Sequence, residues 1–163
     1  MDSNIKSNTS FWSEISDYKI QVPYYQRDYA QGRIDNGRID NIRKVFVEEM
    51  YGAIMGFNNK ECHLGLVFGS YDENEKVFIA VDGQQRLTTI YLVIHYFNEM
   101  WVGKSKIRVP KIKYATRNNA FKFLECLEID NNDVTPKIEK SIDYIDYHYM
   151  KLAYGTIHEW AEN

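Results

Sequence analysis

The chain has 163 residues, of which 44% are hydrophobic and 26% are charged, a composition that excludes collagen-like, low-complexity and largely disordered proteins. Its 20 basic and 23 acidic side chains leave a net charge of −3, which excludes a protein that binds nucleic acid over its whole surface. No apolar run reaches the roughly 18–20 residues of a membrane span, and the N-terminus lacks the apolar block of a signal peptide. We therefore expect a cytoplasmic protein with no membrane partner, in which Cys62 and Cys126 are free thiols.

The first predicted elements are a short helical turn capped by Ser10 and an extended run from Lys19 to Val22. Pro23 ends that run. Residues 24–38 then combine aromatic and arginine side chains with two glycines, which predicts an exposed loop. From Ile39 to Gly56 apolar residues recur at spacings of three and four, so an amphipathic helix follows.

A hairpin and a buried helix are predicted in the middle of the chain. Two β-like runs, 63–71 and 76–81, flank the acidic turn 72–75, and the second run is apolar on both faces and so central in its sheet. Asp82-Gly83 breaks this strand, and residues 84–101 show the apolar periodicity of a buried helix.

The last third of the chain is predicted to be mostly helical. Residues 104–113 carry five basic side chains among apolar ones, which indicates an edge strand protected by lysine and is also the best local candidate for a DNA contact. A helix is predicted over 118–129, and Thr135-Pro136 predicts the start of another that runs toward the C-terminus, with its tyrosines on the packing face. We therefore expect an α+β fold with a small mixed sheet flanked by helices, a nucleotide-binding domain at 1–130 and a C-terminal helical segment at 131–163.

The strongest candidates for a functional site lie at the junction of the buried strand and the buried helix. Polar side chains gathered between two apolar elements indicate a functional or structural role. A helix N-terminus binds anions, Gly83 lacks a Cβ that would keep a phosphate away, and Arg86 adds a forked cation. Asp82 can hold a Mg²⁺-bound water, accept from a ribose hydroxyl or cap the helix, and the two glutamines that follow can donate to phosphate or read a base edge. The plainer interpretation is a capping aspartate, an ion-paired arginine and solvated glutamines. The junction contains neither GxxxxGK[ST] nor GxGxxG.

Four segments resemble the motifs of one bacterial family. The segment 81–89, VDGQQRLTT, looks like the DGQQR signature of the domain that forms the N-terminal part of GmrSD-type, modification-dependent restriction systems. The upstream segment 22–29, VPYYQRDY, resembles that family's proline followed by Tyr-Gln-Arg and a further tyrosine. Residues 63–67, HLGLV, are similar to its Leu-Gly-x-Val strand, and residues 114–117, YATR, resemble its Thr-Arg element.

This resemblance implies a fold similar to the ParB/sulfiredoxin core, in which the Asp-Gly-x-x-Arg turn holds a nucleotide phosphate. It also implies binding and hydrolysis of a nucleoside triphosphate with Mg²⁺, coupled to DNA restriction by a C-terminal HNH-type nuclease domain. Carried over by position, the expected catalytic residues are Asp82, Gln85 and Arg86, with Asp82 also as the metal ligand. The expected nucleotide-binding residues are Gln26, Arg27, Gly83, Gln84, Thr88 and Arg117.

Two functions remain open at this point. The first is a nucleoside triphosphate phosphohydrolase, and the second is a non-catalytic DNA-binding or nucleotide-sensing module. We expect no nuclease activity from this chain, because it shows no His-rich metal motif or carboxylate cluster with nuclease spacing outside helix-packing positions. We also expect the tyrosine rings of the segment 22–29 to pack while Gln26 and Arg27 face the same ligand as Arg86.

Overall fold

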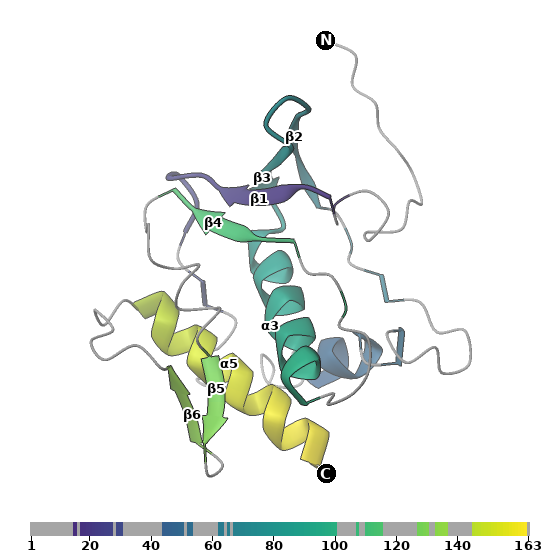
Figure 1. The fold of residues 1–163 in the computed structure, drawn as a ribbon, viewed down its shortest axis with the longest axis vertical. Helices are drawn as coiled ribbons and strands as arrows, with labels where there is room; N and C mark the ends of the chain where they lie inside the picture. The colour runs from purple at the N-terminus through teal and green to yellow at the C-terminus, as the bar shows by residue number, and fades with distance from the viewer. Residues whose placement is uncertain are drawn as a thin grey trace.

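The computed structural model describes residues 15, 17–27, 29–30, 44–50, 52–53, 62–63, 65, 67–100, 107, 110–115, 127–130, 133–136 and 145–162. Within them a mixed four-stranded sheet packs against helices (Figure 1). The strands, in the spatial order β2-β3-β1-β4, are β1 (Lys19–Val22), β2 (Phe68–Asp72), β3 (Val77–Asp82) and β4 (Ile112–Tyr114). Strand β1 runs parallel to β3 and β4, whereas β2 runs antiparallel to β3. This confirms the predicted α+β class, the hairpin and the interior position of β3.

One face of the sheet is apolar because side chains alternate between the two faces of a strand. The residues buried on this face come from the three parallel strands: Ile20, Val22, Phe78, Ala80, Ile112 and Tyr114. Helix α3 (Gln84–Met100) covers them with its first turns, where the Thr88 hydroxyl lies 2.5 Å from the hydroxyl of Tyr114. The predicted helix over 84–101 is confirmed for residues 84–100, and residue 101 lies outside the described residues. The start of α3 is thus fixed by the sheet core.

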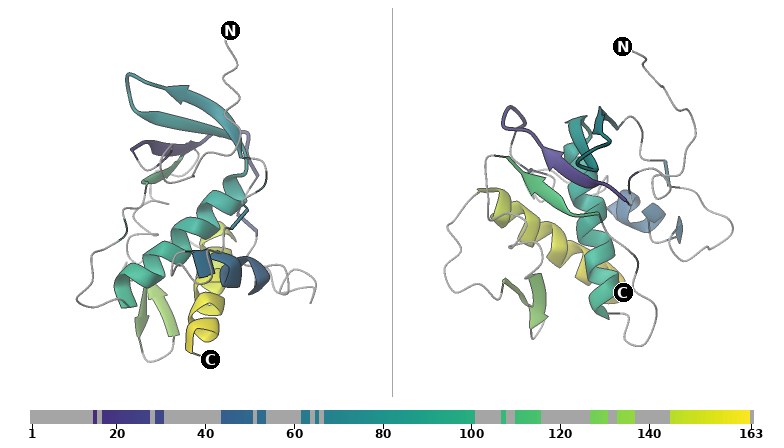
Figure 2. Two further views of the ribbon diagram at one scale, coloured as in Figure 1. Left: turned by 90° about the vertical axis from the view of Figure 1, so that its right-hand side faces the viewer. Right: turned by 45° about the horizontal axis from the view of Figure 1, so that its top comes forward.

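Helix α5 (Ile145–Glu162) packs against α3 away from the sheet, so α3 lies between the sheet and α5 (Figure 2). The rings of Tyr96 and Tyr154 meet edge to face with centroids 5.7 Å apart, and the Tyr96 hydroxyl lies 3.3 Å from His158 Nδ1. The predicted packing role of the tyrosines in this helix is confirmed for Tyr154. Within the described residues, no helix has both the length and the apolar character that crossing a membrane requires.

The segment before α5 differs from the prediction. Leu127–Asp130 and Asp133–Pro136 form an antiparallel pair, β5 and β6, so the predicted helix is wrong for residues 127–129, and the predicted helix start at Thr135-Pro136 is wrong as well. Residues 118–126 lie outside the described part. Pro136 pairs with Leu127 at the end of the ladder, where a missing N–H is tolerated. The predicted boundary between residues 130 and 131 falls between these two strands.

The predicted amphipathic helix before the hairpin is confirmed where the structure describes it. Residues 44–50 and 52–53 are helical, and the side chains of Val47 and Met50 join the core. Phe46 packs against that core from a partly buried position. The remainder of the predicted span, from Ile39 to Gly56, lies outside the described residues.

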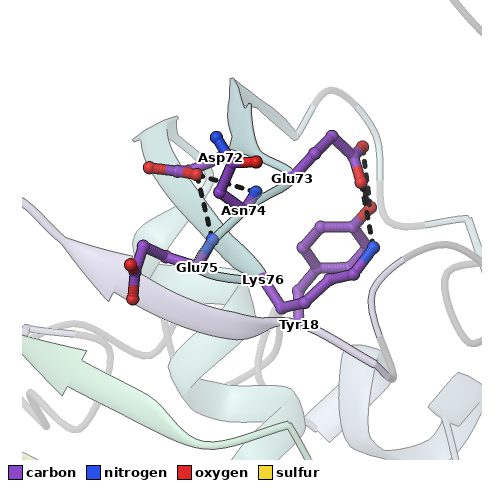
Figure 3. Close-up of polar contacts among 6 residues, drawn as sticks. All are labelled: Tyr18, Asp72, Glu73, Asn74, Glu75 and Lys76. Atoms are coloured by element: carbon purple, nitrogen blue, oxygen red, sulfur yellow. Dashed lines mark hydrogen bonds and ion pairs between the residues drawn. The ribbon is translucent and has the colours of Figure 1, made fainter.

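The turn between β2 and β3 is closed by local hydrogen bonds and tied to the segment before β1 (Figure 3). Asp72 Oδ1 accepts from the backbone N–H groups of residues 74 and 75, at 3.0 and 3.1 Å. The Tyr18 hydroxyl donates to the Glu73 carboxylate at 2.8 Å, and Lys76 Nζ lies 3.0 Å from the same group. The hydrogen bond to Glu73 raises the pKa of Tyr18 and of Lys76 above their ordinary values. These contacts orient the exposed hairpin with respect to β1.

Candidate functional site

The candidate site lies at the edge of the sheet where the three parallel strands end. The carboxyl ends of parallel strands meet at the same edge of a sheet, so the segments after β1, β3 and β4 are neighbours. The backbone N–H of Ala115, directly after β4, donates to the carbonyl of Val22 at 2.8 Å. Both polar motifs and the start of the Thr-Arg element therefore gather at one edge.

The turn from β3 into α3 requires a glycine. Gly83 has a φ of +87°, a left-handed conformation that side chains with a Cβ rarely adopt, and a Cβ there would lie 3.0 Å from Val67 Cγ2. The carbonyl of Gly83 accepts the first helical bond, from Leu87 N at 3.0 Å. Asp82 Oδ1 accepts from the Gly83 N–H at 2.7 Å, so this carboxylate braces the turn one residue before the helix. A glycine is therefore needed at position 83 to make room for Val67, whether or not a ligand also binds there.

The two polar motifs are held side by side although more than 50 residues separate them. Each of four hydrogen bonds joins a residue of 26–30 to a residue of 81–89. They are Gln26 Nε2 to Val81 O (2.5 Å), Gln84 Nε2 to Arg27 O (2.5 Å), Ala30 N to Gln85 Oε1 (2.9 Å), and Tyr29 Oη with Thr89 Oγ1 (2.9 Å). The two motifs therefore form one structural unit.

The glutamines of both motifs serve this unit. One side-chain amide atom of each of three glutamines forms a hydrogen bond to the other segment. These residues are Gln26, Gln84 and Gln85, and the sequence did not predict this role. The side chain of Gln84 is only 3% exposed, and its Oε1 has no hydrogen-bond partner among the described residues. Buried polar atoms are nearly always paired, so this oxygen can accept a further hydrogen bond.

Arg86 stands in the first turn of α3, which contains no acidic side chain. A Cβ built on Gly65 would lie 3.6 Å from Arg86 Nη1 and 3.7 Å from its Cζ, so the guanidinium lies against the backbone of Gly65. Gly65 has a φ of +66°. The segment that resembles the Leu-Gly-x-Val motif thus reaches the same turn twice, through Gly65 at Arg86 and through Val67 at Gly83. Residue 63, predicted in a strand, precedes β2 and is exposed.

The threonines of the signature support the turn from within. Thr88 is fully buried; its hydroxyl donates to the Gln84 carbonyl at 2.9 Å and also meets Tyr114. Thr89 donates to the Gln85 carbonyl at 2.9 Å and bonds the fully buried Tyr29. Thr88, expected among the nucleotide-binding residues, is thus held by protein groups in this structure.

The remaining predicted site residues are distributed as follows. Arg27 is exposed, and its backbone carbonyl accepts a hydrogen bond from the Gln84 side chain, whereas Arg117 lies outside the described residues. Asp82 is exposed at the sheet edge, which leaves it accessible to a cation. In the part of the chain that the structure describes, no group of three or more His, Cys, Asp and Glu side chains could hold a metal ion.

Cys62, which directly precedes the segment 63–67, is expected to react slowly with alkylating agents. Burial, and secondarily the charge of Glu49, raise the pKa of its thiol to about 11. A raised pKa keeps the neutral thiol to higher pH, so near pH 8 the thiolate is about 100-fold rarer than for a thiol of pKa 9. Peptide mapping after timed iodoacetamide treatment measures this rate for Cys62 alone, and Glu49→Gln should increase it. A rate at pH 8 equal to that of free cysteine would contradict the assignment.

Comparison with known proteins assigns the family. Residues 10–160 match the family described as GmrSD restriction endonuclease, N-terminal domain. Searches of curated proteins and of solved structures gave no significant match. The family match covers the sheet, α3, the β5–β6 pair and nearly all of α5. The chain therefore belongs to the family of GmrSD restriction endonuclease N-terminal domains, which makes it a component of a restriction system.

Proposed function

We propose that this domain binds a nucleoside triphosphate at the start of α3 and hydrolyses it within a restriction system. The observation that supports this most is the bonded unit of the two polar motifs at the carboxyl edge of the sheet. At this unit α3 begins, with no acidic side chain in its first turn and with the guanidinium of Arg86 in that turn. Both features attract phosphate, the first through backbone N–H groups that have no partner within the helix and the second through charge-assisted hydrogen bonds.

Each residue has a role in the proposed chemistry. The N–H groups of residues 84–86 hold phosphate oxygens, because the first N–H groups of a helix lack intrahelical partners. Arg86, with Arg27 from the adjoining loop, stabilises charge that develops on the transferred phosphoryl group. Gln85 stays in place through its bond to Ala30 and orients the attacking water with the rest of its amide. Gln84 offers its buried Oε1 to a donor of the ligand.

Magnesium fits this site only together with the nucleotide. Asp82 is the carboxylate at the turn, and one of its oxygens already accepts from the Gly83 N–H. Mg²⁺ is commonly held by one or two carboxylates plus substrate phosphates, and Asp82 meets that requirement. When bound, the ion would neutralise phosphate charge. Asp82 would hold it or a water bound to it.

Phosphate release from each of the four ribonucleoside triphosphates with Mg²⁺ tests the proposal. We expect release from at least one of them and its loss in Asp82→Asn, while Lys19→Ala serves as the control because Lys19 is exposed at the opposite end of β1. Titration calorimetry with the same nucleotides separates binding from turnover. Binding without release would favour a nucleotide-sensing module, and no binding of any triphosphate would overturn the proposal.

DNA enters the proposed function through the rest of the restriction system. Nucleotide turnover here would control a nuclease of HNH type elsewhere in the system. If the chain contacted DNA through several phosphates, its affinity would fall by orders of magnitude between about 50 and 200 mM salt. Nucleotide binding in a pocket changes far less over that range.

A further inference from the structure

Two tyrosines stand exposed beside the candidate phosphate site. Tyr24 is 76% and Tyr25 is 58% exposed, although large aromatic side chains normally bury most of their surface. Their rings meet edge to face with centroids 5.5 Å apart. We expected the rings of this motif to pack, and of the three described tyrosines only Tyr29 does so. The exposure of the other two therefore needs a different explanation.

The backbone holds these rings in a defined place. Gln26 N donates to the carbonyl of Pro23 at 3.1 Å, which closes a tight turn with Tyr24 and Tyr25 at its two central positions. Pro23, the first residue of the turn, is buried, and the side chain of Gln26, the last residue of the turn, donates to the carbonyl of Val81. Both ends of the turn are thus fixed to the sheet edge. The bonded residue of β3, Val81, directly precedes Asp82-Gly83.

We infer that the Tyr24-Tyr25 turn is the platform on which the base of the bound nucleotide stacks, an inference that rests on the proposed function. Phosphates at the start of α3 would leave the base to extend beyond the sheet edge, where this turn stands. Every nucleobase offers a π-face to an aromatic ring, so such a platform binds without demanding one base. A free nucleotide is favoured over a nucleic acid strand because the turn is tethered directly to the proposed triphosphate site.

The test compares nucleoside triphosphates with inorganic tripolyphosphate, which has the phosphates but no base. In calorimetry with Mg²⁺, Tyr24→Ala/Tyr25→Ala should weaken nucleotide binding by about 5- to 150-fold, the range that loss of stacking on one base produces. Tripolyphosphate binding should stay within about two-fold of the unchanged protein. Tyr24→Phe/Tyr25→Phe keeps the rings and should bind nucleotide almost normally.

Met100→Ala is the matched control, since it removes another exposed apolar side chain at the far end of α3, about 24 Å along the helix. Its nucleotide affinity should not change. If the unchanged protein binds tripolyphosphate as tightly as nucleotides, or if the double alanine variant loses both equally, the base platform is refuted while the phosphate site stands. If neither probe binds, the proposed function fails and the platform fails with it.

Discussion

Arg86→Ala is expected to weaken triphosphate binding by ten-fold or more without unfolding the domain. A charge-assisted hydrogen bond contributes roughly 1.5–3 kcal/mol, and this arginine is the cation in the first turn of α3. The fold should survive because the guanidinium lies against the backbone of Gly65 and lies outside the apolar core. Titration calorimetry measures the affinity, and near-ultraviolet circular dichroism checks the tertiary structure.

Two further variants sharpen this experiment. Arg86→Lys keeps the charge but loses the fork that matches phosphate oxygens, so its affinity should fall between those of the unchanged protein and the alanine variant. Arg27→Ala, alone and combined with Arg86→Ala, shows whether both arginines hold one ligand, because variants that share a ligand combine non-additively. Unchanged affinity in a folded Arg86→Ala protein would remove Arg86 from the site.

Local signals explain why the central part of the fold could be predicted. An apolar strand, the Asp82-Gly83 break and the apolar periodicity that follows are all encoded within about 25 residues. The structure reproduces them as β3 and α3, and the acidic turn before β3 closes the predicted hairpin. The family could also be predicted, from four short segments that resemble its motifs, and the match over residues 10–160 confirms it.

The sequence could not show how the motifs meet. The bonds from Gln26, Gln84 and Gln85 cross 55–57 positions, and no spacing rule distinguishes a glutamine that faces a ligand from one that holds a loop. Tyr29 is fully buried inside a segment whose composition indicates an exposed loop, because its hydroxyl finds Thr89 in the core. A prediction from local pattern therefore identifies the polar residues of this site but not their partners.

The β5–β6 pair was missed for a different reason. Thr135-Pro136 is typical of a helix start, but it equally suits the last residues of a strand, where Pro needs no N–H. The better signal was Asn131-Asn132, since Asp130 pairs with Asp133 and leaves only two residues between the strands. Asparagine is common in the short loops of β-hairpins, which makes this pair a hairpin signal in the sequence.

Gly83→Ala is expected to destabilise the domain strongly although it adds a single methyl group. A left-handed φ of +87° costs a residue with a Cβ about 1–2 kcal/mol, and the new atom would stand 3.0 Å from Val67 Cγ2 and 3.2 Å from Val67 Cα. Because the second contact is with backbone, rotating the Val67 side chain does not relieve it, and overpacking adds about 1–3 kcal/mol. The sum, about 2–5 kcal/mol, corresponds to a fall in Tm of about 4–20 °C for a chain of this size.

Gly65→Ala separates the two causes, because Gly65 also has a left-handed φ, of +66°, but its added Cβ would meet the Arg86 guanidinium at an ordinary 3.6 Å. It should therefore show the conformational cost alone, about 1–2 kcal/mol. Urea unfolding of the two variants gives the difference directly, provided that their m-values agree. We expect Gly83→Ala to be the less stable by at least about 1 kcal/mol, the overpacking cost. Equal stabilities would mean that the segment 63–67, which contains Val67, moves away freely and does not brace the turn at the start of α3.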